Sequence, residues 1–150
     1  MKIKQQIATM GLVATLLSGA SVCSHGRRND PMAPPQTFDE AKARVEMDQG
    51  VVNMQFARLR QLEYLYQTDA HSSKIKTLTS DICADANKVA PAVKDAQNME
   101  EVVKARGWLR DVSPYDWGSF SATVAFLPDT AKELTSLTNQ LRGMGMTCSL

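Results

Sequence analysis

The chain has 150 residues, of which 43% are hydrophobic and 22% charged, with 17 Lys and Arg against 16 Asp and Glu. This length is enough for one domain with a real hydrophobic core. The near-neutral charge argues against a nucleic-acid partner, because nucleic-acid binding usually needs a basic patch.

Residues 1–22 have the layout of a secretory signal peptide. Lys2 and Lys4 form a positive start, residues 7–22 carry no charge, and a polar, Pro-rich segment follows. A transmembrane anchor is the alternative, but the apolar segment is shorter than the roughly 20 residues that a spanning helix needs. We therefore predict export to the periplasm.

The sequence leaves two alternative cleavage sites for this signal peptide. Residues 18–20, Ser-Gly-Ala, fit an ordinary signal-peptidase site. Residues 20–23, Ala-Ser-Val-Cys, look like a degenerate lipoprotein box, in which Cys23 would carry a lipid and tether the protein to the outer membrane. Val22 departs from that box, since small residues normally precede the modified Cys. Cys23 is otherwise a free thiol near a flexible terminus.

Residues 23–36 are predicted to form a disordered tether, because this polar, Gly- and Pro-containing segment offers no core residues. The sequence thus divides into a signal peptide (1–22), a tether (23–36) and a helical domain (37–150).

Three cysteines are present, and Cys23 lies outside the domain. In an oxidising compartment the remaining pair, Cys83 and Cys148, is expected to form a disulfide. The alternative is a buried Cys83 and a frayed Cys148. Cys83 has no neighbour at a chelating spacing, and the only histidines are His25, in the tether, and His71, so we expect no metal and no cofactor.

The first predicted helix covers residues 38–68. Thr37 and Glu40 form a capping box at its start. Apolar residues then recur at three- and four-residue steps, which predicts one inward face. This face comprises Val45, Val52, Phe56, Leu59, Leu62 and Tyr66.

A polar joint at residues 69–73 precedes a second predicted helix, in which Pro91 should cause a kink. Its apolar stripe comprises Ile75, Leu78, Ile82, Ala86, Val89 and Val93. Asn98 and Glu101 resemble another capping box, which predicts a separate short helix through Leu109.

The segment from Ser113 to Gly118 is predicted to be a turn-rich loop. A last helix begins at Phe120 with a kink at Pro128, or begins afresh at Pro128, and stops at Gly143. Its apolar stripe comprises Leu134, Leu137 and Leu141. The fold class is therefore all-α, a small four-helix bundle-like domain whose tail is pinned to the second helix.

No catalytic constellation is visible, and we predict that the protein is not an enzyme. His71 lies beside Ser72 and Ser73 in a polar joint, where a solvated histidine is expected rather than a catalytic base. No Gly-rich phosphate loop is present, no pair of carboxylates stands out, and no small-molecule substrate is evident.

Aromatic residues supply the candidate partner-binding positions. Tyr64, Leu65 and Tyr66 are consecutive, so they cannot all face one core. Tyr115 and Trp117 are expected on the predicted loop, and such residues are common interface anchors. The alternative is that this loop folds back and Trp117 plugs one end of the bundle.

The string Lys104-Ala105-Arg106-Gly107-Trp108 is similar to a segment of the small helical pilotin lipoproteins of type II secretion. The likeness covers about residues 83–148, together with an exported terminus, a polar tether and a two-cysteine helical domain. It implies a groove between helices that captures a short helical segment of an outer-membrane secretin. It also implies a structural role for the bond between Cys83 and Cys148.

The expected function is that of a non-enzymatic binding or assembly protein of the bacterial cell envelope, with a pilotin as its most concrete form. One alternative is a periplasmic immunity or inhibitor protein that neutralises a toxin or a cell-wall hydrolase. Another is an entry-exclusion protein of conjugation or phage origin. In each case the expected partner is another protein, either a secretin segment, a toxin or another envelope component.

Overall fold

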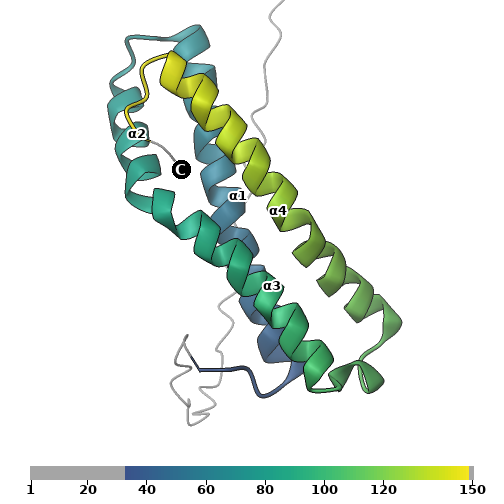
Figure 1. Cartoon of the computed structure of the whole chain (residues 1–150). Helices are drawn as coiled ribbons and strands as arrows, with labels where there is room; N and C mark the ends of the chain where they lie inside the picture. Colours follow the sequence, from purple (N-terminus) through teal and green to yellow (C-terminus); the bar gives the residue numbers. More distant parts are fainter. Residues whose placement is uncertain (1–32, 149–150) are drawn as a thin grey trace, which may run out of the picture. The chain divides into compact units, whose positions relative to one another are not determined.

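The computed structural model describes residues 33–148. The predicted signal peptide, its cleavage site, Cys23 and most of the predicted tether lie outside these residues. Within them the regular elements are all helical (Figure 1), which confirms the all-α fold. They are α1 (Phe38–Thr68), α2 (Ser73–Asp85), the 3-10 turn η1 (Ala86–Lys88), α3 (Val89–Ala105), the 3-10 turn η2 (Trp108–Arg110) and α4 (Pro114–Gly143). No helix among them is long and apolar enough to span a bilayer.

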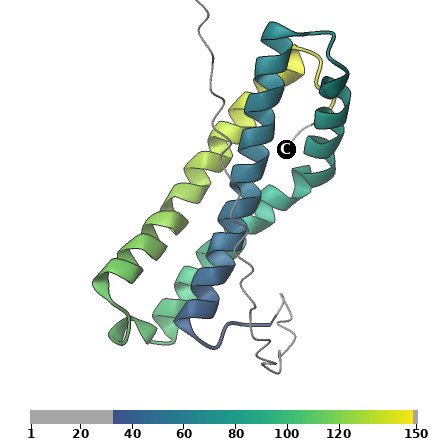
Figure 2. The ribbon, with the colours of Figure 1, turned by 180° about the vertical axis from the view of Figure 1, so that it is seen from behind.

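The four helices form three columns, namely α1, α4 and a column in which α2, η1 and α3 follow one another along the same side (Figures 1 and 2). Lys42 and Asp116 pair at the starts of α1 and α4, with Nζ and Oδ1 3.2 Å apart. Gln140 donates a hydrogen bond of 3.1 Å to Glu63 at the ends of the same helices. The helices α1 and α4 are therefore parallel, and α3 runs antiparallel to both.

Helix α1 begins and ends where the sequence predicts. The Thr37 hydroxyl accepts a hydrogen bond of 3.2 Å from the Glu40 amide, as the capping box requires. The Glu40 carboxylate accepts from the Gln36 amide at 2.6 Å, one residue earlier than the motif expects. Pro35 is also buried, so contacts with the domain begin before Thr37.

The core side of α1 follows the predicted stripe, with two additions. Four of the six predicted residues are buried, and Phe56 and Tyr66 are half-buried. Ala41 and Gln55 are buried as well. The buried residues of α1 are Ala41, Val45, Val52, Gln55, Leu59 and Leu62.

The predicted kink near Pro91 takes the form of η1. Proline has no amide hydrogen to donate to the carbonyl four residues earlier, and its ring crowds that carbonyl. The chain therefore tightens into a 3-10 turn at residues 86–88 and restarts as α3 at Val89, which places Pro91 in the first turn of the new helix.

The prediction of a separate helix opening at Asn98 and Glu101 is wrong. Helix α3 runs unbroken from Val89 to Ala105, and Asn98 and Glu101 are exposed on its outer side. The reason is that the buried stripe continues through this region at helical spacing, so burial of apolar surface outweighs the capping pattern. This stripe comprises Val89, Ala92, Ala96, Met99 and Val103.

The string Arg106-Gly107-Trp108 marks the end of α3. Gly107 has φ +69°, in the left-handed region that glycine adopts without a steric cost, and its amide donates to the Lys104 carbonyl at 3.1 Å. Trp108, in η2, is half-buried against the core.

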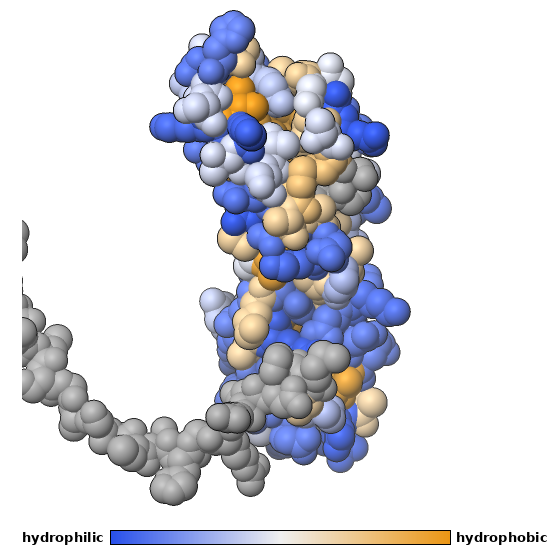
Figure 3. Space-filling view, turned by 90° about the vertical axis from the view of Figure 1, so that its left-hand side faces the viewer, coloured by the Kyte–Doolittle hydropathy of each residue, from blue (hydrophilic) through white to orange (hydrophobic). Residues whose placement is uncertain are grey.

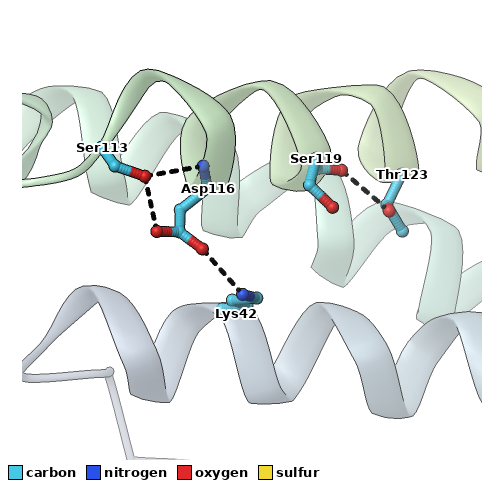
Figure 4. Close-up of polar contacts among 5 residues, drawn as sticks. All are labelled: Lys42, Ser113, Asp116, Ser119 and Thr123. Atoms are coloured by element: carbon cyan, nitrogen blue, oxygen red, sulfur yellow. Dashed lines mark hydrogen bonds and ion pairs between the residues drawn. The ribbon is translucent and has the colours of Figure 1, made fainter.

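The predicted loop at Ser113 to Gly118 is also wrong, because α4 already begins at Pro114. The Ser113 hydroxyl accepts a hydrogen bond of 3.0 Å from the Asp116 amide (Figure 4), and Pro114 occupies the first helical position, which suits its fixed φ. Helix α4 then continues through Pro128, so neither predicted start is correct. Its predicted stripe of Leu134, Leu137 and Leu141 is buried, and Gly143 is its last residue.

The tail after α4 turns back into the domain. Gly145 has φ +117°, and the Met146 amide donates to the Leu141 carbonyl at 3.0 Å. Met146 is buried in the core, and the sulfur atoms of Cys148 and Cys83 lie 2.02 Å apart. The tail is therefore pinned to α2, as the sequence predicts.

Replacing both Cys83 and Cys148 with Ser should lower the free energy of unfolding by roughly 4 kcal/mol, because the bond closes a loop with a sequence separation of 65. Urea unfolding of the oxidised protein and of the double variant, followed by circular dichroism, measures the difference. Equal transition midpoints would contradict a stabilising role for this bond.

Candidate functional site

A hollow of about 470 Å³ lies at the disulfide end of the domain, between the end of α1, helix α2 and the tail. The side of the domain seen in Figure 3 carries small apolar patches among polar side chains. The hollow is lined by Tyr66, Ala70, His71, Ser72, Ile75, Lys76, Thr79, Ser80, Cys83, Gly145 and Thr147.

The half-buried residues of this hollow give it an interior that is partly apolar. Tyr66, Ile75 and Cys83 are half-buried, as are the polar Ser72 and Thr79, whereas the other polar lining residues are exposed at the rim. The Thr79 hydroxyl, which also lines the hollow, is buried and has no hydrogen-bond partner among the described residues. Half-buried apolar side chains with a polar rim form a surface that can hold a side chain or a helical segment of a partner.

His71 lies at the rim of this hollow, in the polar joint between α1 and α2. It is exposed, and no hydrogen bond links its ring to Ser72 or Ser73 in the described part of the chain. Within residues 33–148, no group of three His, Cys, Asp or Glu side chains has a geometry that could hold a metal ion.

A second hollow, of about 360 Å³, lies at the opposite end, where α1 and α4 begin. Trp108 forms part of it, together with Asp111 and Asp116. Hydrogen bonds from Ser113 and then from Lys42 lower the pKa of Asp116. Because these bonds cap α4 and join it to α1 (Figure 4), Asp116 has a structural role there.

The four predicted partner-binding residues lie at two opposite ends of the domain. Tyr64 and Tyr66 lie at the end of α1, and the Tyr64 side chain is 63% exposed, whereas Tyr66 lines the larger hollow. Tyr115 and Trp117 lie in the first turn of α4, and Tyr115 is 84% exposed. The structure therefore does not combine them into one surface.

Trp117 packs at the end of the bundle. Its ring centroid lies 5.7 Å from that of Phe120, which in turn lies 5.4 Å from the ring of Phe38. Trp117 thus joins a row of aromatic rings between α1 and α4. This matches the alternative in which Trp117 plugs one end, although it does so from a helix and not from a loop.

An ion pair between Arg44 and Asp95 joins α1 to α3. Arg44 donates to both oxygens of Asp95, with Nη2 and Oδ1 2.9 Å apart. Burial, and next to it the charge of Asp95, raise the pKa of Asp48 to about 7, although Arg44 opposes the shift. Neither of the two described hollows is lined by these residues, which join α1 to α3.

The raised pKa of Asp48 predicts a pH-dependent stability. Between pH 3.8 and about 7 the folded state keeps a proton that the unfolded state releases, so the free energy of unfolding should fall as pH rises through this window. Asp48→Asn should flatten the dependence and stabilise the protein at pH 8. Thermal unfolding across this range tests it, and an unchanged slope in the variant would contradict the assignment.

The structure exposes three large apolar residues that the sequence reading did not single out: Met47, Met54 and Phe126. Met47 and Met54 lie seven residues apart on the outer side of α1, and this spacing is visible in the sequence. This spacing did not lead to the prediction of a second face, because the inward stripe already explained a helix over the same residues.

Comparison with models of known protein families, with curated proteins and with solved structures finds no match to this chain.

Proposed function

We propose that this chain is an exported, non-enzymatic protein-binding domain of the bacterial cell envelope, and that it holds a short helical segment of a partner in the hollow at its disulfide end. The observation that carries the proposal is the group of half-buried apolar side chains in this hollow, which lies between two helices and a tail anchored by Cys83 and Cys148. An amphipathic helix laid into an apolar groove is a common mode of peptide recognition.

The lining of the hollow favours a protein segment over a small molecule. Sites for small ligands are usually enclosed and bury most of the ligand. Here most lining residues, including Lys76 and Ser80, are exposed, so the occupant would keep one side in solvent. A helix with apolar residues toward Tyr66 and Ile75 meets this condition.

The likeness to pilotins supplies the most concrete partner, a helical segment of an outer-membrane secretin. The Cys83–Cys148 bond supports export, because structural disulfides persist in oxidising compartments. Lipidation of Cys23 would then hold the domain at the outer membrane.

Blocking the rim of the hollow should weaken partner binding. Ser80→Trp places a large ring at an exposed rim position, whereas Ser136→Trp makes the same change on the exposed side of α4, outside the hollow. A photo-crosslinking residue at position 80, introduced in the producing bacterium, identifies the partner. We expect Ser80→Trp to lower its affinity at least about tenfold, or about 1.4 kcal/mol.

Equal affinity of the two Trp variants for that partner would contradict the assignment of the hollow. A partner segment that is not helical when bound would contradict the proposed recognition mode.

The mass of the intact mature protein tests the proposed location. We expect a chain that begins at Cys23 with acyl groups, or one that begins at Ser21, and in either case a mass lower by two hydrogens than that of the reduced form. A chain that begins at Met1 and is recovered from the cytosol with all thiols reduced would contradict export.

A further inference from the structure

Helix α1 carries a second uncharged stripe on the face opposite its core side. Its residues recur at alternating four- and three-residue steps, and all are exposed. They are Ala43, Met47, Gly50, Met54, Ala57, Gln61 and Tyr64. Figure 2 views the domain from the side on which α1 lies in front of the other described helices. At 1.5 Å per residue this outer stripe is about 32 Å long.

Up to Gln61, the outer stripe alternates in size in a way that suits an antiparallel copy of itself. Small residues occur every seven positions at 43, 50 and 57, and larger residues every seven positions at 47, 54 and 61. In one antiparallel register Met47 lies against Ala57 of a second copy, Met54 against Gly50, and Gln61 against Ala43. Each layer then pairs a large side chain with a small one, the condition for close packing of two helices.

The same register matches the charges along one flank. Glu46 of one copy lies opposite Arg60 of the other, on the side of α1 next to the outer stripe. Arg60 also pairs with Glu63 of its own chain, at 3.0 Å, so it would share its charge between the two carboxylates. Glu46 makes no hydrogen bond or ion pair within residues 33–148, so it is available for this contact. On the other flank, Arg44 and Arg58 already pair with aspartates of their own chain, which limits repulsion between copies.

Phe126 is a further apolar residue exposed on α4. Its side chain is 71% exposed. It precedes Gln140 by fourteen residues, close to four helical turns, and Gln140 donates a hydrogen bond to Glu63 of α1. Phe126 therefore lies on the same side of α4 as Gln140, where its ring is exposed.

We propose that two copies of this chain pair through the outer stripe of α1, antiparallel, about a two-fold axis that passes between Gly50 and Met54. A two-fold dimer requires a self-complementary surface, and here size and charge are complementary in a single register. The dimer does not depend on the proposed function, because the outer stripe shares no residue with the lining of the larger hollow.

Sedimentation equilibrium of the purified oxidised protein tests the dimer. We expect twice the chain mass at high concentration. Gly50→Leu should raise the dimer dissociation constant at least about tenfold. It should leave the monomer folded, because no atom lies within 4 Å of the added Cβ and Leu favours the helix. Gly118→Leu is the matched control, since that glycine of α4 also faces open space.

A charge swap tests the register. Glu46→Lys and Arg60→Glu should each weaken the dimer, because each single change sets like charges opposite one another. The double variant should restore it, because the exchanged charges again attract each other between the two copies. Lys132→Glu, on the exposed side of α4, controls for net charge. A monomer at every concentration, equal behaviour of the two Leu variants, or a double variant no better than the single ones would overturn the proposal.

Discussion

The covalent link between Cys83 and Cys148 is the constraint on which the disulfide end of the domain depends. Helix α2, all of which the structure describes, fully buries only Ile82, although Ile75 and Leu78 are partly buried against the core and Asp85 pairs with Arg58 of α1. The tail adds to these contacts by placing Met146 in the core and by bonding to α2. Without this link the larger hollow would lose one of its three walls, and with it the surface proposed to hold a partner.

Helix α1 organises the remainder, because α2, α3 and α4 all pack against it. One face supplies buried residues such as Val52 and Leu59, while half-buried Arg44 and Arg58 bind aspartates of neighbouring elements. The opposite face is uncharged and exposed over much of its length. The core of the domain covers only the first of these two faces, and the exposed, uncharged second face is the physical basis for the proposed pairing of copies.

The sequence predicted the features that rest on local chemistry and long periodicity. The bounds of α1 followed from the cap at Thr37 and an unbroken stripe, and the cysteine pair followed from counting. The errors arose where two local signals competed. At Asn98 a capping pattern lay inside a helix that tertiary packing kept intact, and at Ser113 a true cap was read as part of a loop. The hollow could not be predicted, because it depends on how the tail returns to α2.

Tryptic peptide mapping of the purified protein under non-reducing conditions tests the central constraint most directly. The account predicts that the peptide of residues 77–88, which contains Cys83, is joined to the peptide of residues 143–150, which contains Cys148, and that reduction separates them. Recovery of Cys83 as a freely alkylated thiol, or bonded to Cys23, would contradict it. In either case the bond that anchors the tail to α2 would be absent, and the proposed binding hollow would lack the fixed wall that the tail supplies.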